Sequence, residues 1–294
     1  MNGITVIIPT LNRSDFLINT LKDLVKHECD FPFEILVVDQ SKVEDKEVVE
    51  FAKEYNTIKY HYITTFRGLP EARNYGASVA KYDFLLYLDD DISCNPNLLT
   101  EHYKALLIED VGIVAGGITE KNKPNIGEKV GHFIKWSATP LRVFHINKNK
   151  EVLHAGGSNF SVKKNIFYLV FGVDENLTKG AALYEETDFS FRVKNLGYKV
   201  YFNYNAHVFH LAADTGGCRV PDIVKYIKSL SRNRSIIIGR HLPWYFKISA
   251  HLYLLRLVIS YMITYRKIEV IKSYYNGVLE GNKVAKQTPL NSFI

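Results

Sequence analysis

The sequence predicts an α/β protein with a doubly wound, mostly parallel sheet and a helical extension at the C-terminus. Apolar, β-branched runs alternate with segments of helical periodicity over the first 118 residues, the order that builds a parallel sheet. Acidic residues gather where two of these runs end, and such sheets bind ligands at the carboxyl ends of their strands. Residues 220–294 instead show the pattern of amphipathic helices.

Each expected element follows from its local pattern. Strands are predicted at residues 4–10, 33–39, 58–64, 84–89 and 111–118, where apolar runs end in polar or turn-forming residues. A helix is predicted to begin at Ser14, a candidate N-cap, and others at 44–55, at 70–80 with Pro70 at its start, and at 96–108. An irregular excursion at about 119–151 is followed by a strand-like run at 153–162, a helix at 185–197 and an aromatic strand at 199–211.

Length and composition indicate a protein with a substantial core and an uneven charge. The chain has 294 residues, of which 47% are hydrophobic and 23% charged, and a formal charge of +6. Residues 216–294 hold 13 Lys and Arg against 3 Asp and Glu, a net +10, whereas the first 215 residues hold 24 against 28, a net −4. This asymmetry suggests a neutral-to-acidic catalytic body and a basic tail that faces something anionic.

Compartment signals favour a cytoplasmic protein. The three cysteines, at positions 29, 94 and 218, are scattered without metal-ligand spacing, so no disulfide framework is expected. The N-terminus enters an apolar strand at once and shows no secretion-signal pattern. No spanning helix is expected in the tail, because its longest stretch free of charge and histidine, residues 257–265, is far shorter than the roughly 20 residues that a bilayer requires.

A triplet of aspartates, Asp89, Asp90 and Asp91, closes the apolar run at 84–88 and is the strongest candidate for a site. Along an extended segment Asp89 and Asp91 point to one side and Asp90 to the other, so two carboxylates can converge on one hard cation. Mg²⁺ or Mn²⁺ held in this way usually keeps water and substrate phosphate as its other ligands. The alternative is a solvated acidic turn.

Further along the chain, three groups of residues could join this site. The glycines of Gly156-Gly157-Ser158-Asn159 allow the backbone to approach a ligand closely, although a plain turn has the same pattern. Glu185, Glu186 and Asp188 open a helix, where the helix dipole alone explains acids, but one of them is a candidate general base. His210 ends the last predicted strand and becomes a candidate metal ligand if it faces Asp91.

Taken in order, the motifs resemble those of the family 2 glycosyltransferases, which have the GT-A fold. The likeness runs through most of residues 3–219, and its ordered succession is specific although each piece is weak alone. The matching pieces are Val6-Ile7-Ile8-Pro9-Thr10-Leu11-Asn12-Arg13, Val37-Val38-Asp39-Gln40-Ser41, Ala72-Arg73-Asn74-Tyr75-Gly76, Leu88-Asp89-Asp90-Asp91, Gly156-Gly157-Ser158-Asn159, Phe171-Gly172-Val173-Asp174-Glu175, Glu185-Glu186-Thr187-Asp188 with Arg192 and Gly197, and His210.

The resemblance implies a metal-dependent, inverting transferase that moves a sugar from a nucleotide-sugar donor to a hydroxyl of a glycan or lipid-linked acceptor. UDP is the commonest carrier in the family, and GDP and dTDP are the alternatives. It implies a catalytic domain over 1–219, with a nucleotide half at about 1–118 and an acceptor half at about 119–219, and a basic amphipathic tail over 220–294. The implied nucleotide-binding residues are Pro9, Thr10, Arg13, Asp39, Arg73, Asp89 and Asp90.

The resemblance also implies the remaining roles. Asp91, Asp89 and His210 would hold the Mn²⁺ or Mg²⁺ ion, and Gly157, Ser158 and Asn159 would border the donor sugar and acceptor. Where the family usually has Glu-Asp, this chain has Glu185-Glu186. Glu186 therefore takes the position of the base, with Asp188 and Glu185 as the other candidates. Similarly, Gln40 stands where the family often has Asp or Asn, which leaves the nucleotide base open.

Other function classes fit the sequence less well. The chain has no GxGxxG or GxxxxGK[ST] motif, which weighs against a dinucleotide dehydrogenase or a P-loop ATPase. A sugar-nucleotide pyrophosphorylase would need a Gly-rich phosphate loop with Arg and Lys near the N-terminus, and residues 4–13 have none. A non-catalytic nucleotide- or carbohydrate-binding protein has no need to keep both the metal and the base carboxylates. Nucleic acid is not expected as a partner. The basic and aromatic residues of the tail follow the spacing of amphipathic helices and do not form an exposed platform on which bases could stack.

The tail permits two interpretations. Its helices, the first beginning at Pro221-Asp222, could dock on the catalytic body with their lysines in solvent. Alternatively, aromatic residues together with Lys and Arg could form a surface for peripheral contact with an anionic membrane, at its inner face.

Overall fold

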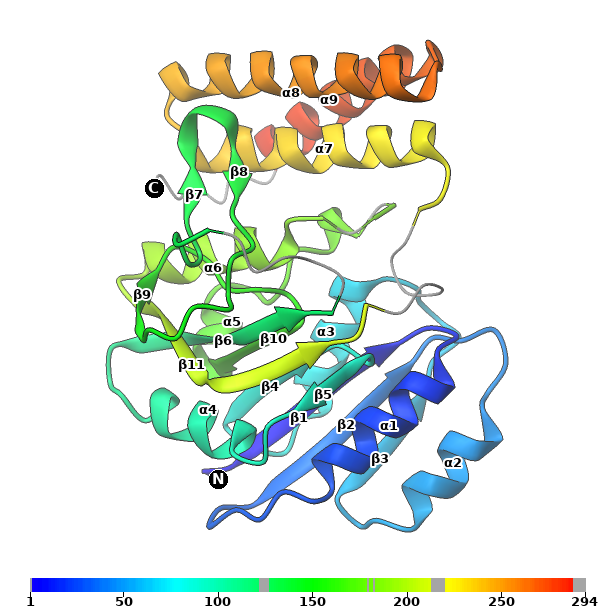
Figure 1. Ribbon diagram of the computed structural model, residues 1–294, viewed down its shortest axis with the longest axis vertical. Helices are drawn as coiled ribbons and strands as arrows, with labels where there is room; N and C mark the ends of the chain where they lie inside the picture. The colour runs from blue at the N-terminus through cyan, green and yellow to red at the C-terminus, as the bar shows by residue number, and fades with distance from the viewer. Residues whose placement is uncertain (1, 122–126, 179, 182, 213–219, 288–294) are drawn as a thin grey trace.

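A large mixed sheet forms the centre of the molecule (Figure 1). The computed structural model describes residues 2–121, 127–178, 180–181, 183–212 and 220–287. In this part of the chain nine strands join one sheet, in the order β3-β2-β1-β4-β10-β6-β11-β5, with β9 also paired to β11. The strands are β1 (Ile4–Thr10), β2 (Phe33–Asp39), β3 (Ile58–Tyr62), β4 (Phe84–Leu88), β5 (Ile92–Cys94), β6 (Val111–Glu120), β9 (Lys150–Val152), β10 (Asn159–Lys163) and β11 (Lys199–His210).

The strand pairing confirms the α/β class and adds detail to it. Strands β3, β2, β1 and β4 are parallel to one another, as are β6 and β11. Strand β10 is antiparallel to both of its neighbours, β4 and β6, and short β5 and β9 are antiparallel to β11. The strands of the first half lie where the sequence predicts them, within one or two residues at each end. Strand β5, which has only three residues, was not predicted from the sequence.

Helices cover both faces of the sheet, as a doubly wound fold requires. Because side chains alternate along β10, Ser161 reaches His102 of α4 on one face, while Phe160 packs near Phe189 of α6 on the other. Figure 1 shows α1 and α2 in front of the sheet and α3 behind it. The helices of this part are α1 (Ser14–Leu24), α2 (Lys46–Lys53), α3 (Leu69–Val79), α4 (Leu98–Leu106), α5 (Lys164–Leu169) and α6 (Glu185–Asn195).

The excursion after β6 contains little regular structure. A short hairpin of β7 (Phe133–Ile134) and β8 (Thr139–Pro140), with the single turn η1 (Lys135–Ser137) at its tip, rises toward the C-terminal helices (Figure 1). A second single turn, η2 (Glu175–Leu177), follows α5. Cys29 and Cys94 are both free, and Cys218 lies outside the described residues.

Three helices build the C-terminal layer: α7 (Ile223–His241), α8 (Trp244–Tyr265) and α9 (Glu269–Gln287). Pro221-Asp222 does open the first of them, and Asp222 accepts hydrogen bonds from the backbone of Val224 and Lys225. A second apolar core joins this layer to the body. It comprises Phe133, Ala138, Tyr184 and Phe191 of the body with Ile227, Leu230, Ile237, Ile238, Leu242, Ala250, Leu254, Val258 and Val270.

The length argument against a spanning helix in the tail needs a correction. Among the described residues, α8 is long and apolar enough to cross a membrane, judged by length and composition alone. Of the residues in its most apolar stretch, 17% are buried. The expectation counted only residues 257–265, which are free of charge and histidine, but the helix continues through His251 and Arg256 and has 22 residues. A helix packed on a soluble body can have the same length and composition. The predicted boundary after residue 219 adjoins residues 213–219, which are outside the described part.

Candidate active site

The aspartate triplet lies in the turn between β4 and β5. Strand β5 pairs with β11 so that Ile92 stands opposite His210, and the carbonyl of Asp91 accepts a hydrogen bond from the backbone N–H of Leu211. On its other side β11 pairs with β6, which places Glu120 opposite His210. Three strand ends therefore bring acidic residues and a histidine together from positions 30 to 120 residues apart.

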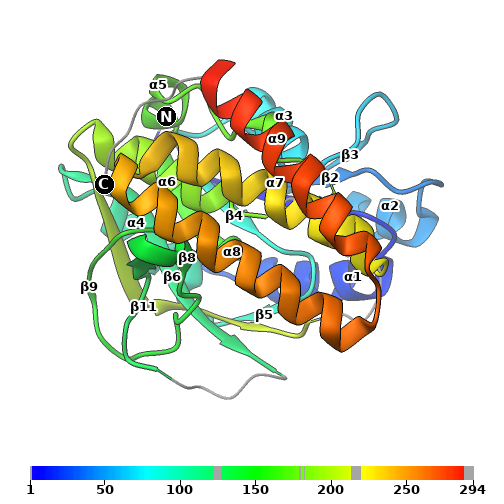
Figure 2. The same ribbon diagram turned by 90° about the horizontal axis from the view of Figure 1, so that it is seen from above.

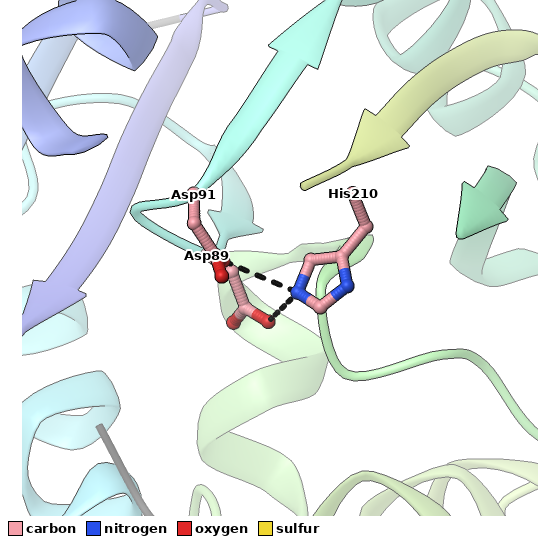
Figure 3. Close-up of side chains that lie close together, drawn as sticks. All are labelled: Asp89, Asp91 and His210. Carbon is pink, nitrogen blue, oxygen red and sulfur yellow. Dashed lines mark ion pairs between the residues drawn. The ribbon is translucent and has the colours of Figure 1, made fainter. Parts of the chain in front are cut away.

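Asp89, Asp91 and His210 converge on one point (Figure 3). His210 Nε2 lies 3.4 Å from Asp89 Oδ2 and 3.2 Å from Asp91 Oδ1. One ligand atom from each residue lies within 4.8 Å of the other two. Adjacent ligands of an octahedral ion, each about 2.1 Å from the metal, are about 3 Å apart, so the three residues fit a divalent cation of the Mg²⁺ or Mn²⁺ type.

His210 is held by carboxylates on both of its nitrogens. Its Nδ1 lies 3.6 Å from Glu120 Oε2, on the side opposite Asp89 and Asp91. Burial alone would lower the pKa of His210, but hydrogen bonds with Asp89, Asp91 and Glu120 outweigh burial and raise the pKa to about 12. A carboxylate behind the second nitrogen is the usual way of orienting a metal-binding histidine.

Asp90 points the other way, as the alternation of an extended segment predicts. Its carboxylate accepts hydrogen bonds from Thr10 Oγ1 at 2.7 Å and Arg13 Nη1 at 3.0 Å. Arg13 also lies 3.5 Å from Asp91. Burial raises the pKa of Asp90 to about 6, against the opposing effect of Arg13 and Thr10. The buried Asp90 thus ties the loop after β1, where the nucleotide is expected, to the loop that carries Asp89 and Asp91.

The predicted nucleotide residues of β1 and β2 border a pocket. Thr10 and Asp39, which end the two neighbouring strands, line a pocket of about 270 Å³ together with Asn12, Ser14, Leu17, Ser41, Lys42, Val43, Asp45 and Val48. Asp39 is buried and accepts hydrogen bonds from Tyr60 Oη at 2.6 Å and from the backbone N–H of Ser41 at 2.8 Å. Pro9 is half-buried in β1 next to Thr10.

Arg73 links the nucleotide half to the expected catalytic helix. Its guanidinium is fully buried, pairs with Glu185 Oε1 at 2.8 Å and donates to the carbonyl of Gly157 at 2.7 Å. A methyl group added at Gly157 would lie 3.5 Å from Arg73 Nη2 and 3.8 Å from the carboxyl carbon of Glu186, so this loop passes directly beside the helix. The backbone carbonyl of Ser158 in turn accepts a hydrogen bond from the backbone N–H of Asp89. The loop at 157–158 therefore connects the acid triplet with the acidic helix.

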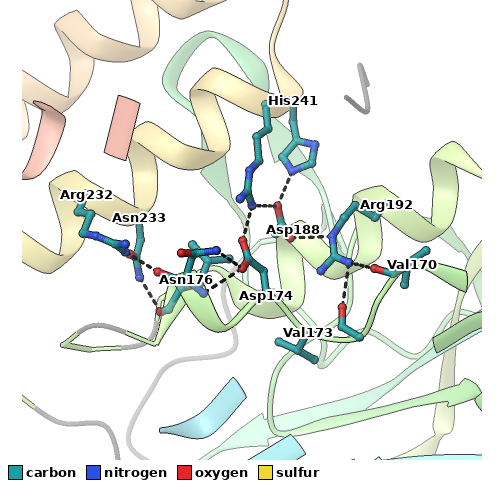
Figure 4. A network of polar contacts seen from close by, with 12 residues as sticks. Val170, Val173, Asp174, Asn176, Asp188, Arg192, Arg232, Asn233 and His241 are labelled. Atoms are coloured by element: carbon teal, nitrogen blue, oxygen red, sulfur yellow. Dashed lines mark hydrogen bonds and ion pairs between the residues drawn. The ribbon is translucent and has the colours of Figure 1, made fainter. Parts of the chain in front are cut away.

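The three acids of α6, Glu185, Glu186 and Asp188, have different neighbours. Glu185 is engaged by Arg73, and burial and the neighbouring Glu186 together raise its pKa. Glu186 lies 3.9 Å from Arg142, whose side chain is half exposed. Asp188 lies apart from the site in a network of buried charges: it contacts Arg192 Nε at 2.8 Å, His241 Nε2 at 2.7 Å and Arg240 Nη1 at 3.2 Å. Figure 4 shows this network between α6 and α7.

Two of the predicted site residues, Asp188 and Asn159, stabilise the fold instead of facing the expected substrate site. Burial would raise the pKa of Asp188, but the ion pairs with Arg192, His241 and Arg240 hold it well below its usual range, and both carboxylate oxygens are bound. We therefore do not retain Asp188 as a base. Asn159 is fully buried, and its amide binds His102, Gly117 and Ala206 inside the fold, so its side chain does not border the crevice.

Sequence reasoning missed two residues of the site. Glu120 ends β6, and the rule that singled out Asp39 and Asp89, an acid at the carboxyl end of a predicted strand, would have found it if that strand had been extended beyond residue 118. Arg142 lies in the irregular excursion, where no periodic pattern relates it to Glu186.

Comparison with known proteins identifies the fold and the family of the chain. The chain is 38% identical over 118 residues to chondroitin synthase of Pasteurella multocida (strain Pm70), a match that covers 39% of this chain and 12% of that protein. The structure of S. aureus TarS 1–349 in complex with UDP-GlcNAc aligns with a TM-score of 0.66 and 16% identity, over 94% of this chain and 79% of that one. GalNAc-T7 with UDP, GalNAc and Mn²⁺ aligns with a TM-score of 0.61 and 18% identity, over 79% and 48%.

These structural likenesses confirm the predicted GT-A fold. The chain spans about an eighth of the length of the synthase that it matches, so the likeness concerns one region of that protein. The model of the family described as Glycosyl transferase family 2 matches residues 5–171, which is more than half of the chain and includes the acid triplet and the loop at 157–158. The chain therefore belongs to glycosyl transferase family 2.

Proposed function

We propose that the chain is an inverting glycosyltransferase that moves a sugar from a nucleotide-sugar donor, a UDP-sugar, to a hydroxyl of a glycan or lipid-linked acceptor. A divalent metal ion, Mn²⁺ or Mg²⁺, would be held by Asp89, Asp91 and His210. Family membership and the GT-A fold support the reaction class.

The observation that carries this proposal is the arrangement of two acidic groups on either side of the loop at 157–158. On one side, Asp89, Asp91 and His210 form a set of ligands for a hard cation. On the other, Glu186 lies next to Gly157 with its carboxylate beside Arg142. A metal-dependent transferase needs both, since a cation held by the first group would bind the departing diphosphate and the second group must take a proton from the acceptor.

The residues of the chain then have separate tasks. When bound, the metal ion would offset the negative charge that develops on the leaving nucleoside diphosphate. Glu186 accepts the proton of the acceptor hydroxyl, a contribution typically worth about 10²–10⁴ in rate. Arg73 fixes Glu185 and the carbonyl of Gly157, and so holds the loop against the helix that carries the base. A single displacement with one base inverts the anomeric carbon.

Similar proteins guide the choice of donor and acceptor. TarS is described with UDP-GlcNAc and GalNAc-T7 with UDP, GalNAc and Mn²⁺, which supports a UDP-sugar and a manganese ion here. The match to a chondroitin synthase supports a glycan acceptor.

A panel of nucleotide sugars, incubated with the purified chain with and without Mn²⁺, tests the proposal. We expect metal-dependent transfer or hydrolysis of one donor, with inverted anomeric configuration in the NMR spectrum of the first-formed product. Glu186→Gln is expected to lower kcat by about 10²–10⁴ and to leave donor binding intact. Glu28→Gln, an exposed glutamate after α1, is the matched control and should change neither.

Three results would contradict the proposal. Tight nucleotide binding that ignores Mn²⁺, without turnover of any donor, would indicate a binding protein. Release of pyrophosphate from a nucleoside triphosphate and a sugar phosphate would indicate a pyrophosphorylase. Retention of the donor configuration would rule out a single displacement.

A further inference from the structure

Helix α8 exposes an unusual amount of apolar surface. Eight of the twenty large hydrophobic side chains that are exposed in the described part of the chain lie within residues 244–268. These are Trp244, Tyr245, Ile248, Leu252, Ile259, Ile263, Tyr265 and Ile268. Single exposed apolar residues are common on soluble proteins, but a contiguous set on one element marks an interaction surface.

Helical spacing places most of these residues on one side. Tyr245, Ile248, Leu252, Ile259 and Ile263 follow one another at intervals of three, four, seven and four residues, and we call them the outer stripe of α8. Leu252 is 63% exposed and Ile263 67% exposed. Figure 2, seen from above, shows α8 lying across the outer layer of the molecule, and the side chains of the stripe are exposed to solvent there.

The ends of this surface are aromatic. Trp244, which begins α8, is 74% exposed, and Tyr265 ends the helix with about half of its surface in solvent. Trp136, at the tip of the β7–β8 hairpin, packs edge-on against Tyr253 of α8 and is 52% exposed. Tryptophan and tyrosine have an apolar ring with a polar group and are enriched where lipid tails meet water.

The charges of this segment all have one sign. Residues 244–268 contain Lys247, Arg256, Arg266 and Lys267 and no Asp or Glu. Arg256 lies between Leu252 and Ile259 along the stripe, and Arg266 and Lys267 follow the end of the helix, all three exposed to solvent. An apolar helix face with cations along it is the pattern of interfacial helices that bind anionic lipids.

We propose that the outer stripe of α8 docks peripherally on a membrane surface that carries anionic lipids. The stripe enters the boundary between headgroups and acyl chains, and the three exposed cations, Arg256, Arg266 and Lys267, contact phosphate and carboxylate headgroups. Such lipids are concentrated in the cytoplasmic leaflet, which is where this contact places the protein. The proposal depends on the surface of α8 and is independent of the reaction at the active site.

The packing of α8 argues against a spanning arrangement. The face opposite the stripe is fully buried at Ala250, Leu254 and Val258, where it packs on α7 and the hairpin of the body. A spanning helix would have to leave this core. It would also bring Arg256 to the middle of the bilayer, which costs about 2.5–3.5 kcal/mol on insertion scales.

The same charges argue against a second copy of the chain as the partner. Two stripes packed face to face would bring Arg256 of each copy into an interface that offers no acidic residue from 244–268. Like charges without a counter-charge disfavour such contacts.

Sedimentation of the full chain with vesicles tests this proposal. Phosphatidylcholine vesicles with and without 30% phosphatidylserine would be used, in about 0.1 M salt. We expect binding to the anionic vesicles to be at least tenfold stronger than to neutral ones, and to weaken as salt is raised. An alkaline carbonate wash should release the protein, because a peripheral contact has no spanning segment.

Two variants separate the apolar and the electrostatic contributions. The stripe variant Leu252→Ser, Ile259→Ser, Ile263→Ser should reduce the partition coefficient at least 100-fold. The charge variant Arg256→Gln, Lys267→Gln should reduce binding to anionic vesicles about 30-fold and hardly change binding to neutral ones. The matched control is Leu107→Ser, Ile108→Ser, Leu169→Ser, which removes three apolar side chains of similar exposure just after α4 and at the end of α5, and should stay within twofold of the wild type.

Four outcomes would overturn the proposal. These are no binding of the wild type to either vesicle, equal loss of binding in the stripe and control variants, resistance to the carbonate wash, and a wild-type dimer in light scattering that the stripe variant dissociates. If the stripe variant does not fold, as judged by its melting transition, the charge variant decides, because it leaves every apolar contact in place.

Discussion

Replacing Asp188 by asparagine tests the assignment of a structural role to an acid that the sequence suggested as a base. The side chain is fully buried and its two oxygens contact Arg192, Arg240 and His241 (Figure 4). Asparagine keeps the shape of the side chain and removes its charge. The substitution therefore leaves the packing nearly unchanged and deprives the cations of a shared counter-charge.

The expected loss of stability depends on the contacts that Arg192 and Arg240 retain in the variant. Breaking a buried ion pair by removing one partner costs about 3–5 kcal/mol. Arg240 retains Asp174 at 2.6 Å, and Arg192 retains the backbone carbonyl of Gly172 at 2.8 Å. Because these two contacts remain, we expect the lower end of the range, about 3 kcal/mol. For a domain of this size that loss corresponds to a decrease of about 6 °C in Tm.

Thermal and urea unfolding at several pH values measure this effect. The pKa of Asp188 is lowered in the folded state, so its contribution to the free energy of unfolding is present above the unfolded pKa of 3.8 and is lost as the pH falls below it. The difference between wild type and Asp188→Asn should therefore be constant between pH 5 and 8 and shrink below about pH 4. Asp110→Asn, which breaks an exposed ion pair with Lys199, is the control and should leave Tm unchanged.

Activity provides the second readout. Well below its Tm, Asp188→Asn should keep kcat within about tenfold of the wild type, because the base lies elsewhere on the helix. A loss of stability below about 1 kcal/mol, or a fall in kcat as deep as that of Glu186→Gln with unchanged stability, would refute the structural assignment.

Three other substitutions have defined outcomes. Asp91→Asn should abolish the Mn²⁺-dependent rise in thermal stability, which for the wild type at 100 times Kd is about 2.7 kcal/mol; an unchanged shift would place the metal elsewhere. Gly76→Ala should lower the free energy of unfolding by about 1–3 kcal/mol, measured with urea, because the added methyl would lie 2.4 Å from Ile7 Cγ2. The control Ser78→Ala, on the exposed side of α3, should change it little. Arg73→Gln breaks a buried ion pair and should cost about 3–5 kcal/mol in the same assay; a cost below 1 kcal/mol would contradict that role.

The sequence predicted most of the first half of the fold because its signals there are local. An apolar run such as residues 84–88 and a helix opened by Pro70 are defined by neighbouring residues. The position of β10 could not be read in this way. It follows β6 in the chain but inserts between β4 and β6 in the sheet, antiparallel to both, and that order is set by packing between segments more than 40 residues apart.

The site likewise has features that the local sequence determines and features that depend on strand pairing. The alternation of Asp89, Asp90 and Asp91 in an extended segment is local, and the structure follows it. That His210 faces Asp91 depends on the pairing of β5 with β11, which the sequence does not specify, so the histidine remained conditional on that contact. Asp188 was a candidate base at the sequence level for a different reason. Residues two apart on a helix lie about 200° apart around its axis, so the spacing itself separates Asp188 from Glu186, and the sequence analysis did not use it.

The charge network also changes how the C-terminal helices relate to catalysis. Arg240 and His241 end α7, within the segment that the sequence set apart as a tail, and they hold Asp188 in the first turns of the helix that presents Glu186. Phe191 of the same helix packs in the second core with α7 and α8. A buried ion pair and an apolar core thus attach α6 to the C-terminal layer from one side, while Arg73 attaches it to the nucleotide half from the other. Contacts from both ends of the chain therefore hold the helix that carries the proposed base, and the C-terminal helices pack on it directly.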